Sequence, residues 1–298
     1  MQFLTYLSAF LLVSNIALSQ TVQGVVYDST NKQAIAYALI SSADKSYGIA
    51  ADSLGKFEID KKFIAASTDV HVAAPGYKPA LIPILRNKLN EIALVKFTPH
   101  DKFETNVPGR RKQSKKYGVF GVKSTSLYMG AYEGSNFEMA LYIQNLNGRL
   151  GKIDTLNILF SKTGIFNSPF RIQFYEEIDG VPGRPVTNEN IILYGFKPNS
   201  LNSFDLSEYH ISFPPNGCFV SVEWLNVNSS GNRYLLKNDR GQYGIGPTIA
   251  LTYDKPVSFL YGRKNGGEWE KVTKIYWDTV TMANVNPVIS LDVSHAKH

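Results

Sequence analysis

The sequence of 298 residues contains one cysteine, Cys218, so no disulfide can form within the chain. It also lacks long stretches with the 3.6-residue hydrophobic period of an amphipathic helix, and we expect helices to be few and short. After the first 20 residues no segment is apolar enough to span a membrane as a helix. These absences exclude a disulfide-stapled fold and a helical bundle, and they exclude helical spans after the N-terminus.

Motifs of common catalytic sites are missing as well. The sequence has no Gly-x-Ser-x-Gly nucleophile elbow and no glycine-rich loop for phosphate. None of the five histidines is followed three residues later by glutamate, which excludes the ligand pair of a zinc carboxypeptidase. Cys218 lies in an apolar run, and we interpret it as a small buried hydrophobic residue rather than a nucleophile. We therefore expect no catalytic residue, no metal ligand and no cofactor, and we do not expect an enzyme.

Carboxylates give only a weak indication of hydrolysis. Glu176 and Glu177 are neighbours on an expected strand, so their side chains point to opposite faces and cannot act together on one sugar. Glu223 could form a distant acid pair with Asp205 or Asp278. An unrecognised hydrolase remains the least favoured hypothesis.

What the sequence does contain is the pattern of strands. Aromatic residues make up 12% of the chain, and aromatic side chains favour strands over helices. Apolar and polar residues alternate from Phe170 to Tyr175, and Cys218, Val220, Val222 and Trp224 share one face of another expected strand. We predict an all-β protein: a small β-sandwich in residues 20–97, and a larger, jelly-roll-like antiparallel β-sandwich in residues 117–298.

The N-terminus has the pattern of an export signal. Residues 3–13 are mostly apolar, and Ala17-Leu18-Ser19 supplies the small residues that a signal peptidase reads. We expect residues 1–19 to be a signal peptide cleaved between Ser19 and Gln20. The alternative, an uncleaved membrane anchor, is disfavoured because the apolar run is short. The expected location of the protein is the periplasm, the outer-membrane surface or the extracellular space.

Three short motifs in the first unit carry a family resemblance. They are Gly24-Val25-Val26-Tyr27-Asp28, the run from Gly48 to Phe57 with Asp52-Ser53-Leu54-Gly55-Lys56-Phe57, and Pro75-Gly76-Tyr77-Lys78. Together they resemble the carboxypeptidase regulatory-like domain. The resemblance implies a transthyretin-like, carbohydrate-binding-like sandwich of the kind found at the front of exported Bacteroidetes proteins, and it implies no peptidase activity.

Several segments of the second unit carry a weaker resemblance. Asp179-Gly180-Val181-Pro182-Gly183 and the strand that ends at Trp224 resemble parts of uncharacterised exported β-sandwich modules of Bacteroidetes. This likeness implies a shared fold and no activity.

A basic segment separates the two units. Residues 98–116 contain Pro99, Pro108 and Gly109 and the cations Arg110, Arg111, Lys112, Lys115 and Lys116, in a chain of net charge +6. We interpret this segment as a solvated linker. Contact with anionic lipid or polysaccharide is the alternative, because clustered cations attract polyanions. Nucleic acid is not an expected partner of an exported chain.

The best candidate for a ligand site lies late in the sequence. Its proposed residues are Tyr261, Arg263, Asn265, Trp269 and Trp277. Flat rings can stack on sugars while arginine and asparagine read hydroxyls. The alternative is that these rings pack between the two sheets of the sandwich, where large aromatic side chains bury much area.

These observations favour a non-catalytic exported binding or adhesion module of the cell envelope, with a polysaccharide as one candidate ligand. The alternative is an accessory protein of an envelope assembly, which would act through contacts with another envelope protein. An exposed aromatic surface would favour the first hypothesis, and a large apolar surface patch would favour the second.

Overall fold

The structure is a computed structural model that describes residues 21–64, 69–86, 88–97, 112–122, 127–227, 230–238, 240–253, 259–272, 274–277, 280–283 and 285–296. The expected signal peptide and its cleavage site at Ser19 and Gln20 lie outside these residues. No helix in the described ranges is long and apolar enough to cross a membrane.

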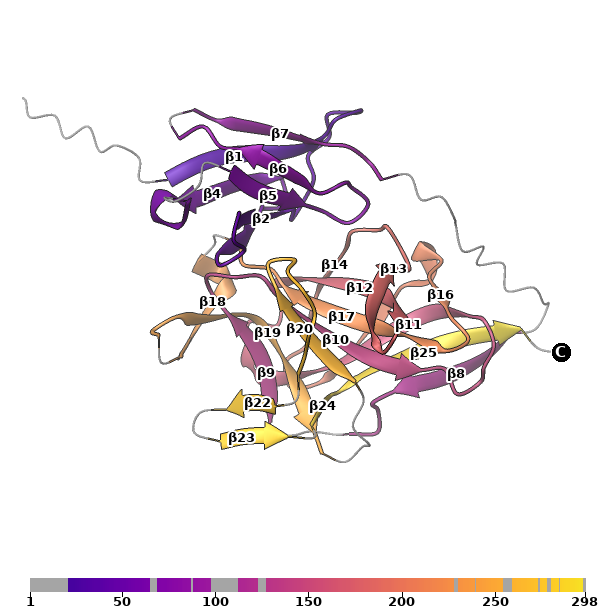
Figure 1. The fold of residues 1–298 in the computed structure, drawn as a ribbon. Coiled ribbons are helices and arrows are strands. Elements are labelled where there is room, and N and C mark those ends of the chain that lie inside the picture. Colours follow the sequence, from indigo (N-terminus) through magenta and orange to yellow (C-terminus); the bar gives the residue numbers. More distant parts are fainter. Residues whose placement is uncertain are drawn as a thin grey trace, which may run out of the picture.

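The prediction of an all-β protein is confirmed (Figure 1). Throughout the described residues the regular elements are strands, apart from three 3₁₀ helices of three or four residues each. The first unit consists of β1 (Thr21–Asp28), β2 (Leu39–Ser42), β3 (Gly48–Ala50), β4 (Lys56–Asp60), η1 (Lys61–Ile64), β5 (Asp69–Ala73), β6 (Ala80–Pro83) and β7 (Asn90–Leu94).

The first unit is a sandwich of two small sheets. One has the strand order β4-β1-β7 and the other β3-β2-β5-β6. Their facing side chains form one core, to which Val26 and Ile92 contribute from the first sheet and Ile40 and Val72 from the second. Strand β7 runs parallel to β1, so this sandwich is not wholly antiparallel.

The three motifs of the family resemblance meet in this sandwich. Asp28 ends β1 and accepts a hydrogen bond from the Tyr77 hydroxyl at 3.0 Å, while Val26 N donates to Gly55 O at 2.8 Å. Gly55 closes the turn before β4 at φ 71°, a conformation that favours glycine. The motifs therefore fix the contacts between β1, the Asp52–Gly55 turn and the segment after β5.

The second unit is larger and contains all later elements. They are β8 (Lys112–Gly118), β9 (Tyr128–Tyr132), β10 (Phe137–Gln144), β11 (Gly151–Gly164), β12 (Pro169–Ile178), β13 (Val181–Pro185), β14 (Ile191–Tyr194), β15 (Leu201–Asp205), η2 (Ser207–Tyr209), β16 (Ser212–Phe213), β17 (Gly217–Trp224), η3 (Ser230–Asn232), β18 (Arg233–Lys237), β19 (Tyr243–Thr252), β20 (Leu260–Lys264), β21 (Glu270–Lys271), β22 (Lys274–Trp277), β23 (Val280–Ala283), β24 (Asn286–Pro287) and β25 (Ile289–Ala296).

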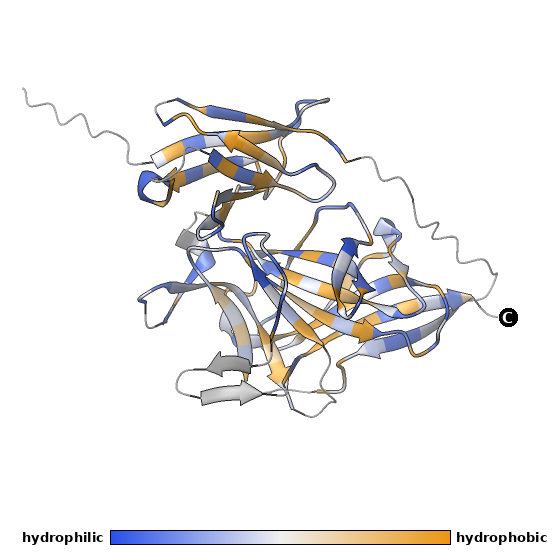
Figure 2. Ribbon diagram, in the orientation of Figure 1, coloured by the Kyte–Doolittle hydropathy of each residue, from blue (hydrophilic) through white to orange (hydrophobic). Residues whose placement is uncertain are grey.

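Two sheets of the second unit face each other across the main core. The seven-stranded sheet has the order β13-β12-β17-β10-β20-β21, with β14 also on β12. The nine-stranded sheet is built on β18-β19-β11-β25-β8. Alternation along the strands sends one set of side chains into this core, as the banding of Figure 2 shows. From β17 that set is Cys218, Val220, Val222 and Trp224, as the sequence predicted.

Strand β17 has a second buried face. All eight of its residues are buried, including Phe219, Ser221 and Glu223, which point away from the main core. A strand at the middle of a sheet has this pattern only when both faces of the sheet are covered. Something must therefore cover the outer face of the seven-stranded sheet.

The smaller sandwich provides part of that cover. Tyr37 and Ala50 of the first unit pack against Leu225, which follows β17. Ala50 N also donates to Asn226 O at 3.1 Å, and Asn226 Nδ2 donates to Gly48 O at 2.8 Å. The β2–β3 hairpin is thus fastened to the larger sandwich by backbone and side-chain hydrogen bonds.

The end of the expected linker is corrected by the structure. Lys112, Lys115 and Lys116 lie in β8, which pairs with β25 at the edge of the nine-stranded sheet. The Nζ atom of Lys116 is 3.4 Å from the carboxylate of Asp292 on β25. These cations are therefore part of a strand of the second sandwich. Lysines are common on edge strands because their charge opposes pairing with other chains.

Candidate functional site

Four charged side chains lie in one line across the outer face of the seven-stranded sheet, and we call them the charged row. Arg171 on β12 is opposite Glu223 on β17, and Glu223 is opposite Glu138 on β10. Glu138 is in turn opposite Arg263 on β20. Directly opposed residues on neighbouring strands have Cβ atoms about 5 Å apart, so the four charges form a continuous line.

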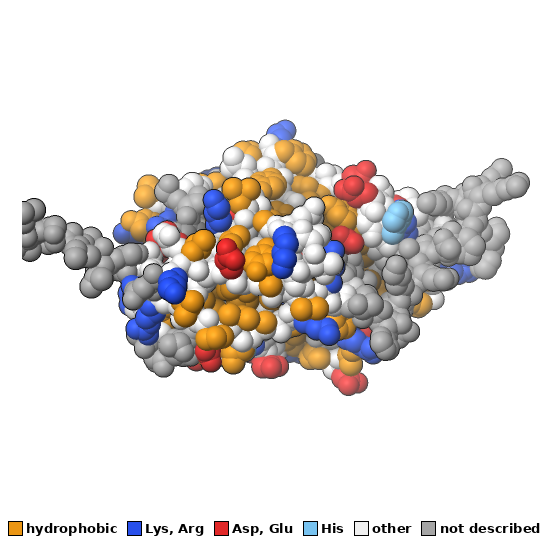
Figure 3. Space-filling view, turned by 90° about the horizontal axis from the view of Figure 1, so that it is seen from above, with side chains coloured by type: hydrophobic (Ala, Val, Ile, Leu, Met, Phe, Trp, Pro, Cys, Tyr) orange, Lys and Arg blue, Asp and Glu red, His pale blue; other side chains and the backbone are white. Residues whose placement is uncertain are grey.

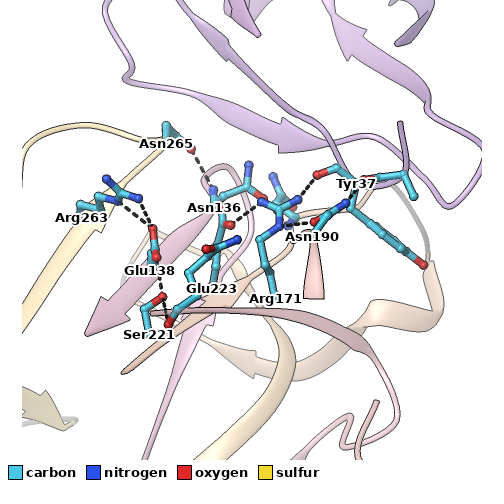
Figure 4. A network of polar contacts seen from close by, with 12 residues as sticks. Tyr37, Asn136, Glu138, Arg171, Asn190, Ser221, Glu223, Arg263 and Asn265 are labelled. Atoms are coloured by element: carbon cyan, nitrogen blue, oxygen red, sulfur yellow. Dashed lines mark hydrogen bonds and ion pairs between the residues drawn. The ribbon is translucent and has the colours of Figure 1, made fainter. Parts of the chain in front are cut away.

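The first half of the charged row ties the sheet to the smaller sandwich (Figure 4). Arg171 Nη1 donates to Glu223 Oε2 at 2.5 Å, and both side chains are at least nine-tenths buried. The other guanidinium nitrogens of Arg171 donate to Asn190 Oδ1 and to the backbone oxygen of Tyr37 in the first unit. Asn190 Nδ2 donates a hydrogen bond to the backbone oxygen of Ala36, the residue before Tyr37.

The second half of the charged row is a network around Glu138. Arg263 donates to Glu138 Oε2 through Nε at 2.7 Å, and Glu138 Oε1 accepts from the hydroxyls of Tyr175 and Ser221 at 2.8 and 2.6 Å. Arg263 Nη2 also donates to the Tyr175 hydroxyl at 2.7 Å. The Trp269 ring covers this network, with the guanidinium carbon of Arg263 at 4.1 Å from its centroid.

Burial and pairing set the charges of this network. Burial raises the pKa of Glu223, Arg171 opposes that rise, and the neighbouring Glu138 adds to it. Burial alone would lower the pKa of Arg263, but Glu138 outweighs it and the pKa is raised. The pKa of Tyr175 is raised well above its ordinary value, mainly by burial, so its hydroxyl stays protonated as a donor. The row is a set of compensated charges, with the guanidinium groups at its two ends.

The acid pair considered for hydrolysis is not formed. Glu223 lies on β17 of the seven-stranded sheet and is bound by Arg171, whereas Asp205 lies on β15 in the other sheet. Asp278 lies outside the described residues. The sheet assignment therefore overturns the pairing of Glu223 with Asp205.

The predicted ligand residues occupy the same outer face, but most of their polar groups are already bound. Tyr261 is buried, and Arg263 belongs to the charged row. Asn265 accepts from Asn136 N at 2.8 Å and donates to Lys45 O at 2.9 Å, so it connects the two sandwiches. Trp269 is half-buried over Tyr175. The side chain of Trp277, the fifth candidate, lies outside the described part of the structure.

The alternative expectation, that these rings pack between the two sheets, is wrong for Tyr261 and Trp269, which pack on the outer face. Tyr261 is buried, yet it contacts Phe219 on the outer face and does not enter the main core. Leu260, its neighbour, points into that core. Burial on the outer face arises because side chains from several strands cover one another there.

A group of four rings continues this face, and Tyr261 is the one member that the sequence singled out. Tyr142, Phe219, Tyr261 and Phe259 form what we call the aromatic row. Tyr142 packs on Phe219 with ring centroids 5.2 Å apart and on Phe259 at 6.2 Å. Phe219 is fully buried beneath them, whereas Tyr142 is half-buried and Phe259 is 48% exposed. Lys271 Nζ lies 5.0 Å from the Phe259 centroid.

The structure agrees with the interpretation of Cys218 as a core residue. Its side chain is fully buried, and burial raises the pKa of the thiol, so the nucleophilic thiolate is disfavoured. Among the described residues, no cluster of three or more His, Cys, Asp or Glu side chains is arranged to hold a metal ion.

Comparisons with known proteins give no family for this chain. No family model matches, and no curated protein matches. A solved structure of a variant of the clostridial cysteine protease Cwp84, after propeptide cleavage, aligns at a TM-score of 0.37 with 13% identity, over 84% of this chain and 52% of that one. The cysteine protease and lectin-like domains of Cwp84, a surface layer associated protein of Clostridium difficile, align at 0.35 with 13% identity, over 94% and 60%.

Proposed function

We propose that this protein is a non-catalytic, exported binding or adhesion module of the cell envelope, and that its ligand is a glycan. The observation that carries the proposal is the aromatic row, in which Phe259 and Tyr142 present ring surface to solvent over a buried ring. Trp269 offers a third, partly exposed ring on the same sheet face. Rings in such positions stack on the apolar faces of sugars, while Lys271 beside Phe259 supplies a donor for hydroxyls or acidic groups.

The export signal and the family resemblance support the same proposal. The pattern of residues 1–19 would deliver the chain to the periplasm, the outer-membrane surface or the extracellular space, where polysaccharides are abundant. In this proposal residues 20–97 are a carboxypeptidase regulatory-like domain, which the three motifs that meet around Asp28 and Gly55 support. In this proposal the smaller sandwich is a scaffold that holds the outer face of the larger one.

A glycan array followed by calorimetry tests the proposal. The wild type should bind with a dissociation constant of roughly micromolar to millimolar, as expected for a stacked sugar with a few hydrogen bonds. Phe259→Ala should weaken binding about fivefold, because one stacked ring contributes on the order of 1 kcal/mol. Tyr253→Ala is the matched control, since Tyr253 is a similarly exposed ring at the end of β19 in the other sheet.

Two results would contradict the proposal. One is that no glycan binds the folded wild type. The other is that Phe259→Ala and Tyr253→Ala weaken binding equally, which would show that the aromatic row is not the site. A thermal melt of each variant separates lost binding from lost folding, and the half-exposed Phe259 should be replaceable without unfolding.

The second candidate function, an accessory role in an envelope assembly, is favoured by the surface of the smaller sandwich. Figure 3 shows groups of apolar side chains separated by charged ones on the face turned away from the larger sandwich. The exposed large apolar residues of this unit and the segment just after it are Leu54, Phe63, Leu81, Leu85, Leu89, Val95 and Phe97. A wild type that binds no glycan but cross-links to an envelope protein through this unit would support this role.

A further inference from the structure

One end of the larger sandwich combines exposed aliphatic side chains with cations. Figure 1 shows β8, β11 and β25 converging there. We call this end the basic tip and define it as the β10–β11 turn, residues 145–150, with Lys115 on β8 and Lys152 on β11. Leu146 in the turn is 81% exposed, and Leu150 is 37% exposed. Leucine on a turn this exposed contributes nothing to the core, so its apolar surface is available to a partner.

Hydrogen bonds hold this turn and the side chain of Lys115 in place. Lys115 Nζ donates to Asn147 Oδ1 at 3.0 Å, which brings β8 against the turn. Asn145 Nδ2 donates to Arg149 O at 2.7 Å and to Pro214 O at 2.8 Å, so the turn is rigid and the neighbouring 214–217 turn lies beside it. Burial is the main cause that lowers the pKa of His295. The nearby positive charges of Lys115 and Arg149 lower this pKa further.

The basic tip is poor in acidic groups. No Asp or Glu occurs in residues 105–132, 139–153 or 209–222, which supply β8, the β10–β11 turn and the 214–217 turn. Three carboxylates lie at its margin. Asp292 pairs with Lys116, Asp154 accepts a hydrogen bond from Ser294, and hydrogen bonds to Ser207, followed by the charge of Lys152, lower the pKa of Asp205. Lys115 and Arg149 form no ion pair with a carboxylate of the described chain, so their charge is not compensated.

We propose that the basic tip docks on the surface of an anionic lipid bilayer. Peripheral attachment needs apolar side chains that enter the headgroup region and cations that attract anionic lipid, and the tip presents both on one rigid turn. A polyanionic polysaccharide would also attract Lys115 and Arg149. Residues 145–150 and 214–217 contain no aromatic ring for sugar stacking, whereas an exposed leucine can enter the headgroup region of a bilayer. The basic tip borders the proposed glycan surface, because the Tyr142 hydroxyl donates to Asn216 O at 2.6 Å, but the inference does not depend on glycan binding.

Co-sedimentation of the full chain with vesicles tests this inference. The wild type should bind phosphatidylcholine vesicles in which about a third of the lipid is phosphatidylglycerol, and it should bind pure phosphatidylcholine vesicles far less. Its affinity for the anionic vesicles should fall as the salt concentration rises. Leu146→Asp should weaken binding about tenfold, because it removes one inserted leucine. Arg149→Ala and Lys115→Ala should each weaken it about fivefold, as expected for one cation near an anionic surface.

Matched controls lie on other surfaces. Leu235→Asp changes an 89% exposed leucine on β18, at the opposite edge of the nine-stranded sheet, and Arg184→Glu changes an 83% exposed arginine on β13. Neither should alter vesicle binding by more than about twofold. The inference is overturned if the wild type fails to bind anionic vesicles or if the controls act like the tip variants. It is also overturned if Leu146→Asp changes nothing while a soluble anionic polysaccharide competes fully, since the tip would then be a polysaccharide site.

Discussion

Replacing Arg171 by methionine should expose how strongly the charged row stabilises the protein. Arg171 is 3% exposed and donates to Glu223, Asn190 and the backbone of Tyr37. Methionine fills most of the same volume but supplies no donor and no charge. In the variant the buried Glu223 carboxylate would still lie beside Glu138, its cross-strand neighbour. Arg263 would be the one remaining cation of the charged row.

The expected magnitude follows from burial. Removing one partner of a buried ion pair costs about 3–5 kcal/mol, because the other charge stays in a medium of low polarity without compensation. The lost hydrogen bonds to Asn190 and Tyr37 O belong to the same change and are included in that range. We therefore expect urea unfolding at pH 7 to show a free energy of unfolding lower by about 3–5 kcal/mol in Arg171→Met.

The pH dependence has a definite sign. Because the pKa of Glu223 is raised in the folded protein, its contribution to stability is fully present below its unfolded pKa and is lost as pH rises through the folded pKa. Without Arg171, which holds that pKa down, the folded pKa would rise further. The difference between variant and wild type should therefore be largest at pH 7 and smaller near pH 4, where Glu223 can bind a proton.

A double variant supplies the control. Glu223→Gln together with Arg171→Met removes the uncompensated charge and should recover more than half of the lost stability at pH 7, since an amide is far cheaper to bury than a carboxylate. A loss below about 1 kcal/mol for Arg171→Met would refute the reasoning, because it would place the pair at the level of a surface salt bridge. An equal loss at pH 4 and pH 7 with no recovery in the double variant would do the same.

Two further predictions concern other buried groups. Cys218 should react with a thiol reagent only as fast as the protein unfolds, because it is fully buried with a raised pKa, and rapid labelling of the native protein would contradict its place in the core. Asn265→Gly should lower the free energy of unfolding by about 2–4 kcal/mol, because it leaves Asn136 N and Lys45 O without their partners while glycine tolerates the φ of 52°. A change under about 1 kcal/mol in urea unfolding would show that this link between the sandwiches is dispensable.

The sequence by itself determined the fold class and the inner faces of the strands. Alternation at every second residue states which side chains share a face, so the core set from Cys218 to Trp224 could be predicted from β17 alone. The absence of catalytic motifs and the turn at Gly55 were equally local features. The same alternation predicts that the side chains of Glu223 and Trp224 point to opposite faces of the sheet, and the structure confirms this.

What only the tertiary structure decided is which strands are neighbours and what covers the outer face. Arg263 could be singled out in the sequence, but its partner Glu138 lies 125 residues earlier and its partner Tyr175 lies 88 residues earlier. Alternation gives the direction of a side chain and carries no information about the strand beside it. Tyr261, Arg263 and Asn265 were predicted to meet a ligand, but they contact other parts of the protein. Tyr142 and Phe259 were brought together by strand pairing. Arg171 is bound by the backbone of Tyr37, in the segment before β2 of the first unit, and no local pattern in either unit encodes that contact.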